Sequence, residues 1–248
     1  MKTTITMLAV VIAVLALAGG ATPETPDCLT CHEDLKAGAF VHNAVVSAGC
    51  TACHSGIDAT DIPHKLLANI PKGLGAETAE LCYTCHDKTK FYAPTIHAPV
   101  GIGLCTSCHN PHSSGVANLL VAEPGKLCFN CHEKEKFSGK KSVHRPVGEG
   151  KCLSCHVPHA SDNEGLVIRK GNILCRRCHP RVEREPHAIT GLRTAGHPVR
   201  GKEDLKRKGK TFECLSCHVA HASEWVRLYR YKANSWEEIC IHCHTDIY

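Results

Sequence analysis

Residues 82–112 read CYTCHDKTKFYAPTIHAPVGIGLCTSCHNPH. This stretch holds two C-x-x-C-H motifs, beginning at Cys82 and Cys105, with His97 between them and His112 after the second. The same arrangement begins again 46 residues later at Cys128 and a further 47 residues later at Cys175. A repeat of this period indicates structural units placed in succession rather than one ordinary globule.

Every one of the 18 cysteines belongs to such a motif, and each motif ends in a histidine. The cysteine pairs are Cys28 and Cys31, Cys50 and Cys53, Cys82 and Cys85, Cys105 and Cys108, Cys128 and Cys131, Cys152 and Cys155, Cys175 and Cys178, Cys214 and Cys217, and Cys240 and Cys243. The motif histidines are His32, His54, His86, His109, His132, His156, His179, His218 and His244.

Disulfides and zinc ribbons are the other common uses of so many cysteines, but neither needs a histidine directly after every pair. C-x-x-C-H is the attachment motif of c-type haem. Its thiols form thioether bonds to the porphyrin, and its histidine becomes the proximal ligand of the iron. We therefore expect nine covalent haem c groups and nine irons.

The second axial ligand of each iron decides between electron transfer and chemistry at the metal. Methionine is excluded because Met1 and Met7 both precede the expected mature chain. Ten histidines remain outside the motifs, and nine are predicted distal ligands: His42, His64, His97, His112, His144, His159, His187, His197 and His221. These histidines follow the motifs along the chain, about one for each motif in order. The ninth iron is left with two candidates, His187 and the tenth histidine outside the motifs, His242. We favour His187, because His242 lies inside the ninth motif. Two imidazoles per iron predict low-potential, coordinatively saturated centres that bind substrate poorly.

The N-terminus has the pattern of a secretory signal peptide, residues 1–18, with Lys2 before an apolar run from Ile5 to Ala18. We expect cleavage after Ala18, with Ala21 as the alternative. An uncleaved anchor is the other interpretation, but the run is shorter than the ~20 residues that span a bilayer. The mature chain, residues 19–248, is expected to be one nonahaem unit in the periplasm or outside the cell.

Composition leaves little material for an ordinary core, since aromatic residues make up 5% of the chain and glycine and proline number 20 and 13. We expect the haems to supply the interior. The predicted fold class is mostly irregular with short α-helices, organised around a chain of haems, with little or no sheet. A capping-box pattern from Ser235 to Glu238 predicts a helix start. The predicted haem-pair repeats span residues 28–64, 81–121, 127–168 and 174–223, and a ninth motif lies within residues 235–248.

The formal charge of +5 does not indicate nucleic-acid binding, because nine haems would add about 18 propionate groups that balance lysine and arginine. The segment from Arg200 to Lys210 holds six basic and two acidic residues. Two interpretations stay open, a docking patch or a solvated loop, and the solvated loop is the simpler one.

The alternation of C-x-x-C-H with an intervening histidine and a C-H-x-P-H ending resembles the doubled-CXXCH multihaem cytochromes. The resemblance is close over residues 81–221, loose over 28–64, and limited to the motif at 240–244. It implies bis-histidine haems in a chain, with close pairs, that pass electrons. We expect no catalytic residues, because multihaem reductases commonly leave one iron open through a motif that ends in lysine, and all nine motifs here end in histidine. The resemblance also implies redox partners, among them an outer-membrane porin or an inner-membrane quinol dehydrogenase. A filament-forming extracellular cytochrome and a multihaem reductase of nitrite or a sulfur oxyanion are the alternatives.

Overall fold

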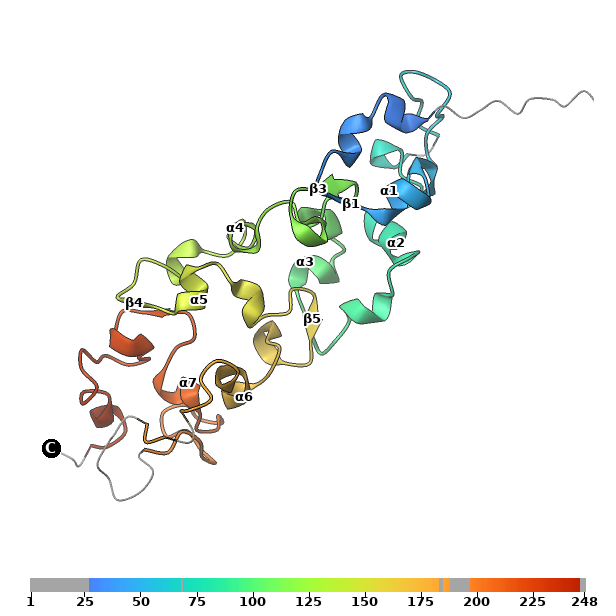
Figure 1. The fold of residues 1–248 in the computed structure, drawn as a ribbon. Helices are drawn as coiled ribbons and strands as arrows, with labels where there is room; N and C mark the ends of the chain where they lie inside the picture. The colour runs from blue at the N-terminus through green and yellow to red at the C-terminus, as the bar shows by residue number, and fades with distance from the viewer. Residues whose placement is uncertain (1–26, 68, 183–184, 188–196, 246–248) are drawn as a thin grey trace, which may run out of the picture.

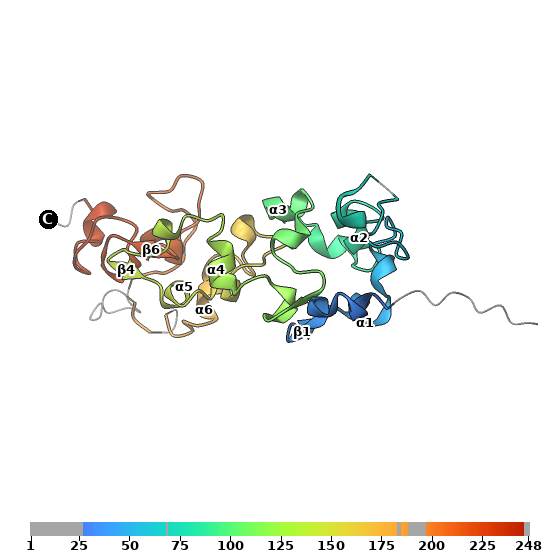
Figure 2. The same ribbon diagram turned by 90° about the horizontal axis from the view of Figure 1, so that it is seen from above.

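A computed structural model describes residues 27–67, 69–182, 185–187 and 197–245. The predicted signal peptide lies outside these residues. The described chain forms an elongated body, and its N-terminal and C-terminal parts lie at opposite ends (Figures 1 and 2). The repeats therefore follow one another along the long axis.

The helices are short, and most of them carry a motif or the approach to one. The α-helices are α1 (Asn43–Ser47), α2 (Thr78–Tyr83), α3 (Ala98–Gly101), α4 (Pro124–Cys128), α5 (Arg145–Gly148), α6 (Gly171–Arg176) and α7 (Cys214–Cys217). The 3₁₀ helices are η1 (Cys28–Thr30), η2 (Glu33–Lys36), η3 (Cys50–Ala52), η4 (Pro71–Gly73), η5 (Lys88–Phe91), η6 (Cys105–Ser107), η7 (Ala117–Leu119), η8 (Lys134–Lys136), η9 (Cys152–Ser154), η10 (Glu164–Leu166), η11 (Val226–Leu228) and η12 (Cys240–His242).

Strands are limited, in the described residues, to three antiparallel two-residue pairs. The strands are β1 (Phe40–Val41), β2 (Thr95–Ile96), β3 (Ser113–Ser114), β4 (Ser142–Val143), β5 (Ala160–Ser161) and β6 (Ala222–Ser223). They pair as β1 with β3, β2 with β5, and β4 with β6, so each pair joins one repeat to the next. Short helices in an otherwise irregular chain confirm the fold class expected from the sequence.

The described residues hold almost no hydrophobic core. Tyr229 and Ala233 are the buried hydrophobic residues among them. Polar residues are buried instead, including Ser113, Ser161 and Ser223 in the strand pairs. The hydroxyls of Ser161 and Ser223 donate to backbone carbonyls six residues further along the chain. Polypeptide packing alone thus buries little apolar surface, and a core of this size stabilises a fold weakly.

The capping box predicted from Ser235 to Glu238 forms only in part, because the Glu238 N–H donates to Ser235 Oγ at 3.5 Å but no helix begins at Ser235. The carboxylate of Glu238 accepts a hydrogen bond from the backbone N–H of Asn234 at 2.8 Å rather than from that of Ser235. The segment stays a turn until η12 begins at Cys240. Among the described residues, no helix is both long and apolar enough to cross a membrane.

Candidate haem sites

Each motif is wound into a single turn of helix. In all nine, the backbone N–H of the motif histidine donates to the carbonyl of the first cysteine, at 2.9–3.1 Å. This i to i−4 bond is that of an α-helix, in which residues three and four apart lie on the same face. The turn therefore brings two thiols and an imidazole to one side of the chain, as attachment to a single porphyrin requires.

Each motif histidine lies opposite one histidine from outside the motifs. The ring centres are separated by 5.9–6.2 Å in nine pairs: His32 with His64, His54 with His112, His86 with His42, His109 with His159, His132 with His97, His156 with His221, His179 with His144, His218 with His187, and His244 with His197. No histidine appears in two of these pairs.

The separation fits a metal held between two imidazoles. An imidazole nitrogen binds a transition metal at about 2 Å, and the ring centre lies roughly 1 Å behind that nitrogen. Two axial imidazoles on one metal thus have centres about 6 Å apart. Rings in direct van der Waals stacking would lie closer together.

A family comparison agrees with this geometry. The doubled CXXCH motif model matches residues 42–91, 97–137, 144–184 and 207–247, which together cover more than half of the chain. The chain belongs to the doubled CXXCH motif family. It is a multihaem c-type cytochrome, with haem bound covalently through its C-x-x-C-H motifs and a role in electron transport. No curated protein matches the chain.

The cytochrome pairs its histidines in an order that differs from the chain order expected from the sequence. Four of them, here called the forward histidines, lie opposite the first motif histidine of the next repeat, or of the ninth motif: His42, His97, His144 and His197. Three others, the backward histidines, lie opposite the second motif histidine of the preceding repeat: His112, His159 and His221. Neighbouring repeats thus exchange histidines.

The strand pairs produce this exchange. Each forward histidine of the first three repeats directly follows β1, β2 or β4, and each backward histidine directly precedes β3, β5 or β6. The backbone N–H of His42 donates to the carbonyl of His112 at 2.8 Å, and that of His144 to the carbonyl of His221 at 2.8 Å. Antiparallel pairing sets the two histidines side by side, so each reaches the motif of the other repeat.

Two histidines, here called the end histidines, lie opposite motifs of their own repeat. His64 lies opposite His32, the first motif histidine of the first repeat. His187 lies opposite His218, the second motif histidine of the fourth repeat. His187, the distal ligand expected for the ninth iron, therefore does not lie at the ninth motif. His197 lies opposite His244, while His187 is placed at the eighth motif.

His242 is oriented differently from the other nine. Its ring stacks on Tyr231 with centres 5.2 Å apart, and its Nε2 lies 2.8 Å from the carbonyl oxygen of Lys232. Its Nε2 is thus engaged with the backbone.

Backbone carbonyls orient the paired rings. Hydrogen bonds join Nδ1 to a carbonyl oxygen at 2.7–3.0 Å in eight histidines: His54, His64, His97, His109, His144, His156, His197 and His218. A proton on Nδ1 leaves the Nε2 lone pair free for a metal, and the hydrogen bond fixes the ring and increases its basicity.

A left-handed turn supplies the carbonyl at the second motif of each of the last three repeats, and the sequence pattern did not predict it. His109 bonds to Asn118, His156 to Gly165 and His218 to Arg227, each nine residues later. Asn118 and Arg227 have φ of 57° and 54°. Positive φ costs a non-glycine residue free energy and is retained where the surroundings enforce it. The sequence signal that could have revealed this turn is the leucine that directly follows each of these three residues.

Burial favours the neutral form of some of the paired histidines. Burial lowers the pKa of His159, with the nearby His109 and His97 adding to the effect. Burial likewise lowers the pKa of His187 and His221. Neutral imidazole is the form that binds a metal.

The thiols of successive motifs lie next to one another. Burial raises the pKa of Cys82 to about 11, and the thiols of Cys105 in the next motif and Cys53 in the preceding one contribute. One thiol influences the pKa of another in every consecutive pair of motifs, lowering it at Cys175 and raising it elsewhere: Cys28 with Cys50, Cys53 with Cys82, Cys82 with Cys105, Cys108 with Cys131, Cys128 with Cys152, Cys155 with Cys178, Cys175 with Cys214, and Cys217 with Cys243. The nine motifs therefore form one row in chain order.

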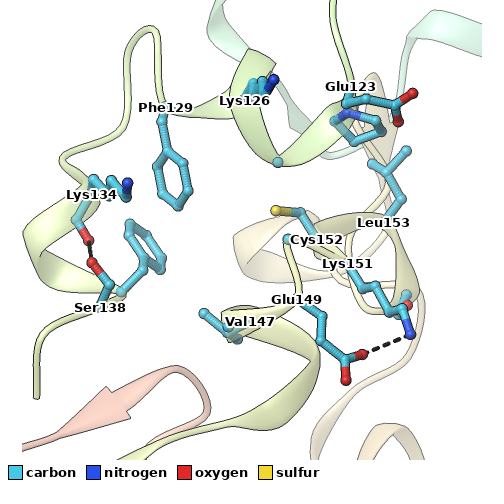
Figure 3. Close-up of a pocket in the computed structure, with 16 residues that line it drawn as sticks. Glu123, Lys126, Phe129, Lys134, Ser138, Val147, Glu149, Lys151, Cys152 and Leu153 are labelled. Carbon is cyan, nitrogen blue, oxygen red and sulfur yellow. Dashed lines mark hydrogen bonds and ion pairs between the residues drawn. The ribbon is translucent and has the colours of Figure 1, made fainter. Parts of the chain in front are cut away.

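A cavity of about 840 Å³ lies at the sixth motif. Phe129, Phe137 and Leu153 line it, and the thiol of Cys152 points into it (Figure 3). Phe137 also packs against His221, with ring centres 4.9 Å apart. Several lysines stand around the cavity: Lys126, Lys134 and Lys151. Apolar walls with nearby cations fit a porphyrin that carries two propionates.

Proposed function

We propose that this cytochrome is a nonahaem electron carrier in which two imidazoles close every iron, and that it is not an enzyme. The nine histidine pairs carry the proposal, because each motif has one partner of its own at a separation that suits a shared metal. The distal ligands are His42, His64, His97, His112, His144, His159, His187, His197 and His221.

Haem c supplies an iron that accepts and releases one electron. The polypeptide contributes ligands whose geometry changes little when the iron gains or loses that electron. A second imidazole at each motif leaves no open coordination position for a substrate, and two nitrogen ligands stabilise ferric iron relative to a histidine and methionine pair. The hydrogen bonds at Nδ1 also stabilise ferric iron, since they increase the basicity of the imidazole ligands.

The row of thiols supports a route in chain order, from the motif at Cys28 to the motif at Cys240. The motifs of each repeat are neighbours, and so are the last motif of one repeat and the first of the next. A continuous row lets electrons enter at one end of the elongated body and leave at the other.

The proposed location is the periplasm or the cell exterior, after cleavage of residues 1–18. C-type attachment of haem fits that compartment, and so does the apolar N-terminal run. The proposed partners are redox proteins, including an outer-membrane porin or an inner-membrane quinol dehydrogenase.

Intact-mass analysis and ligand binding test the proposal together. We expect nine haem additions on a chain that begins near Gly19. Electron paramagnetic resonance of the oxidised protein should show low-spin centres alone, and neither cyanide nor carbon monoxide should bind. A high-spin centre that binds nitrite would instead indicate a reductase, and filaments in negative-stain micrographs would indicate a polymer.

A further inference from the structure

The fourth repeat, residues 174–223, contains an insertion. Four residues, 101–104, separate His97-Ala98-Pro99-Val100 from the next motif, and four residues, 148–151, do so in the following repeat. The corresponding segment after His197-Pro198-Val199 is residues 200–213, which is fourteen residues long. The added length contains the basic segment 200–210, here called the basic loop.

The basic loop has a fixed conformation. Asp204 is 4% exposed, and its carboxylate accepts hydrogen bonds from the backbone N–H groups of Lys206 and Arg207 at 2.9 and 3.0 Å. Arg207 Nε donates to the same carboxylate at 2.6 Å, and its Nη2 donates to Ser216 Oγ at 3.2 Å. At the base of the loop, the Gly201 N–H donates to the carbonyl of Phe212 at 3.0 Å.

This anchoring directs the remaining cations outward. Arg200, Lys202, Lys206, Lys208 and Lys210 are all exposed. Lys210 lies 3.6 Å from the exposed Glu164. In the described part of the chain, no carboxylate lies within ion-pair distance of Lys202, Lys206 or Lys208. Leu205 stands among these cations, and 74% of its surface is exposed.

The basic loop lies beside the ninth motif. Phe212, at the loop's base, packs 5.9 Å from the ring of His197, which lies opposite His244. The loop therefore belongs to the C-terminal end of the row of motifs (Figure 2).

We propose that the basic loop is a docking surface for an acidic face of a redox partner protein, which exchanges electrons at the ninth motif. The inference rests on the proposed electron-carrier function. Unpaired, outward cations attract and orient an acidic partner, and the exposed Leu205 gives the contact an apolar centre. A rigid loop costs little ordering entropy on binding.

The test uses the fully haem-loaded protein and reduced flavodoxin, a small acidic one-electron donor, as the probe. The loop variant carries Lys202→Gln, Lys206→Gln and Lys208→Gln. A matched control carries Lys88→Gln, Lys90→Gln and Lys136→Gln, which neutralise three exposed lysines in the second and third repeats. Stopped-flow reduction rates are measured at low and at physiological ionic strength.

We expect the loop variant to lose about 10-fold in second-order rate at low ionic strength, and the difference to shrink as salt screens the charges. The control should stay within about twofold of the unmodified protein. Equal rates for the loop and control variants would overturn the docking proposal.

Reduction by dithionite and binding to vesicles complete the test. Dithionite needs no docking and should reduce both variants completely, and incomplete reduction of the unmodified protein would refute the electron-carrier function itself. Co-sedimentation with phosphatidylserine vesicles tests a lipid target. Vesicle binding that depends on the loop lysines, without any change in the flavodoxin rate, would assign the loop to a membrane surface and overturn the proposal.

Discussion

The backbone N–H of His97 donates to the carbonyl of His159 at 2.9 Å, although 62 positions separate the two residues in the chain. One is a forward histidine and the other a backward histidine. Their rings lie opposite His132 and His109, so this hydrogen bond links the fourth and fifth sites. The Nδ1 of His97 also bonds to the carbonyl of Pro158 at 2.9 Å. Binding at one site thus helps to position the ligand of the next.

His97→Met should raise the reduction potential of one centre, that of the fifth motif. Thioether stabilises ferric iron less than imidazole does, and the increase should be on the order of 0.1 V. A spectropotentiometric titration of the holoprotein measures it. His242→Met is the matched control and should leave all nine potentials unchanged, because that ring bonds through Nε2 to the backbone. An unchanged potential in His97→Met would remove the residue from the ligand set.

His64→Ala should open the first centre to external ligands. No other described histidine ring lies opposite His32, and the cavity left by the imidazole admits a small molecule. We expect the reduced variant to bind about one carbon monoxide per chain, by optical titration, while the unmodified protein binds none. His242→Ala should behave as the unmodified protein does. Binding at several centres would mean that the substitution disturbs more than one site.

Gly165→Val should destabilise the sixth site. Gly165 has φ of 70°, and its carbonyl accepts the hydrogen bond from His156 Nδ1. A β-branched side chain in this conformation costs on the order of 1–3 kcal/mol and displaces the carbonyl. We expect a lower thermal midpoint and a raised potential at one centre. Gly115→Val serves as the control, since a Cβ there meets nothing within 4 Å and its φ is outside the left-handed region.

Asp204 should make the basic loop sensitive to acid. Burial acts to raise the pKa of its carboxyl, but hydrogen bonds from Ser216 and Arg207 outweigh it and hold the pKa at about 2. The unfolded value is about 3.9, so the charged form stabilises the fold above pH ~4, and this stabilisation is lost as pH falls towards 2. Allowing for solvent screening, it amounts to about 1–2 kcal/mol.

Thermal unfolding of Asp204→Asn at several pH values measures this contribution. The variant should be less stable than the unmodified protein at pH 7, and the two should converge as pH falls through about 2. A difference that does not depend on pH would show that the carboxylate acts through packing alone.

Much of the organisation was readable from local sequence. Each C-x-x-C-H motif forms one helical turn whose geometry depends on five consecutive residues, so Cys82–His86 and its eight counterparts could be identified without a fold. The scarcity of large apolar residues likewise predicted the missing core. The local expectation at Ser235 was wrong, because the Glu238 carboxylate found a different N–H in the turn that forms there.

The sequence by itself determined the number of attachment motifs, the restriction of methionine to positions 1 and 7, and the set of histidines outside the motifs. Tertiary structure alone decided which histidine lies opposite which motif. The physical reason is that imidazole pairing spans repeats: two-residue strands that join neighbouring repeats place His42, His97 and His144 over motifs 35 to 44 residues further along the chain. Proximity in sequence favoured pairing each histidine with the nearest motif. The exchange of histidines between neighbouring repeats depends on backbone hydrogen bonds between those repeats, which the sequence does not show.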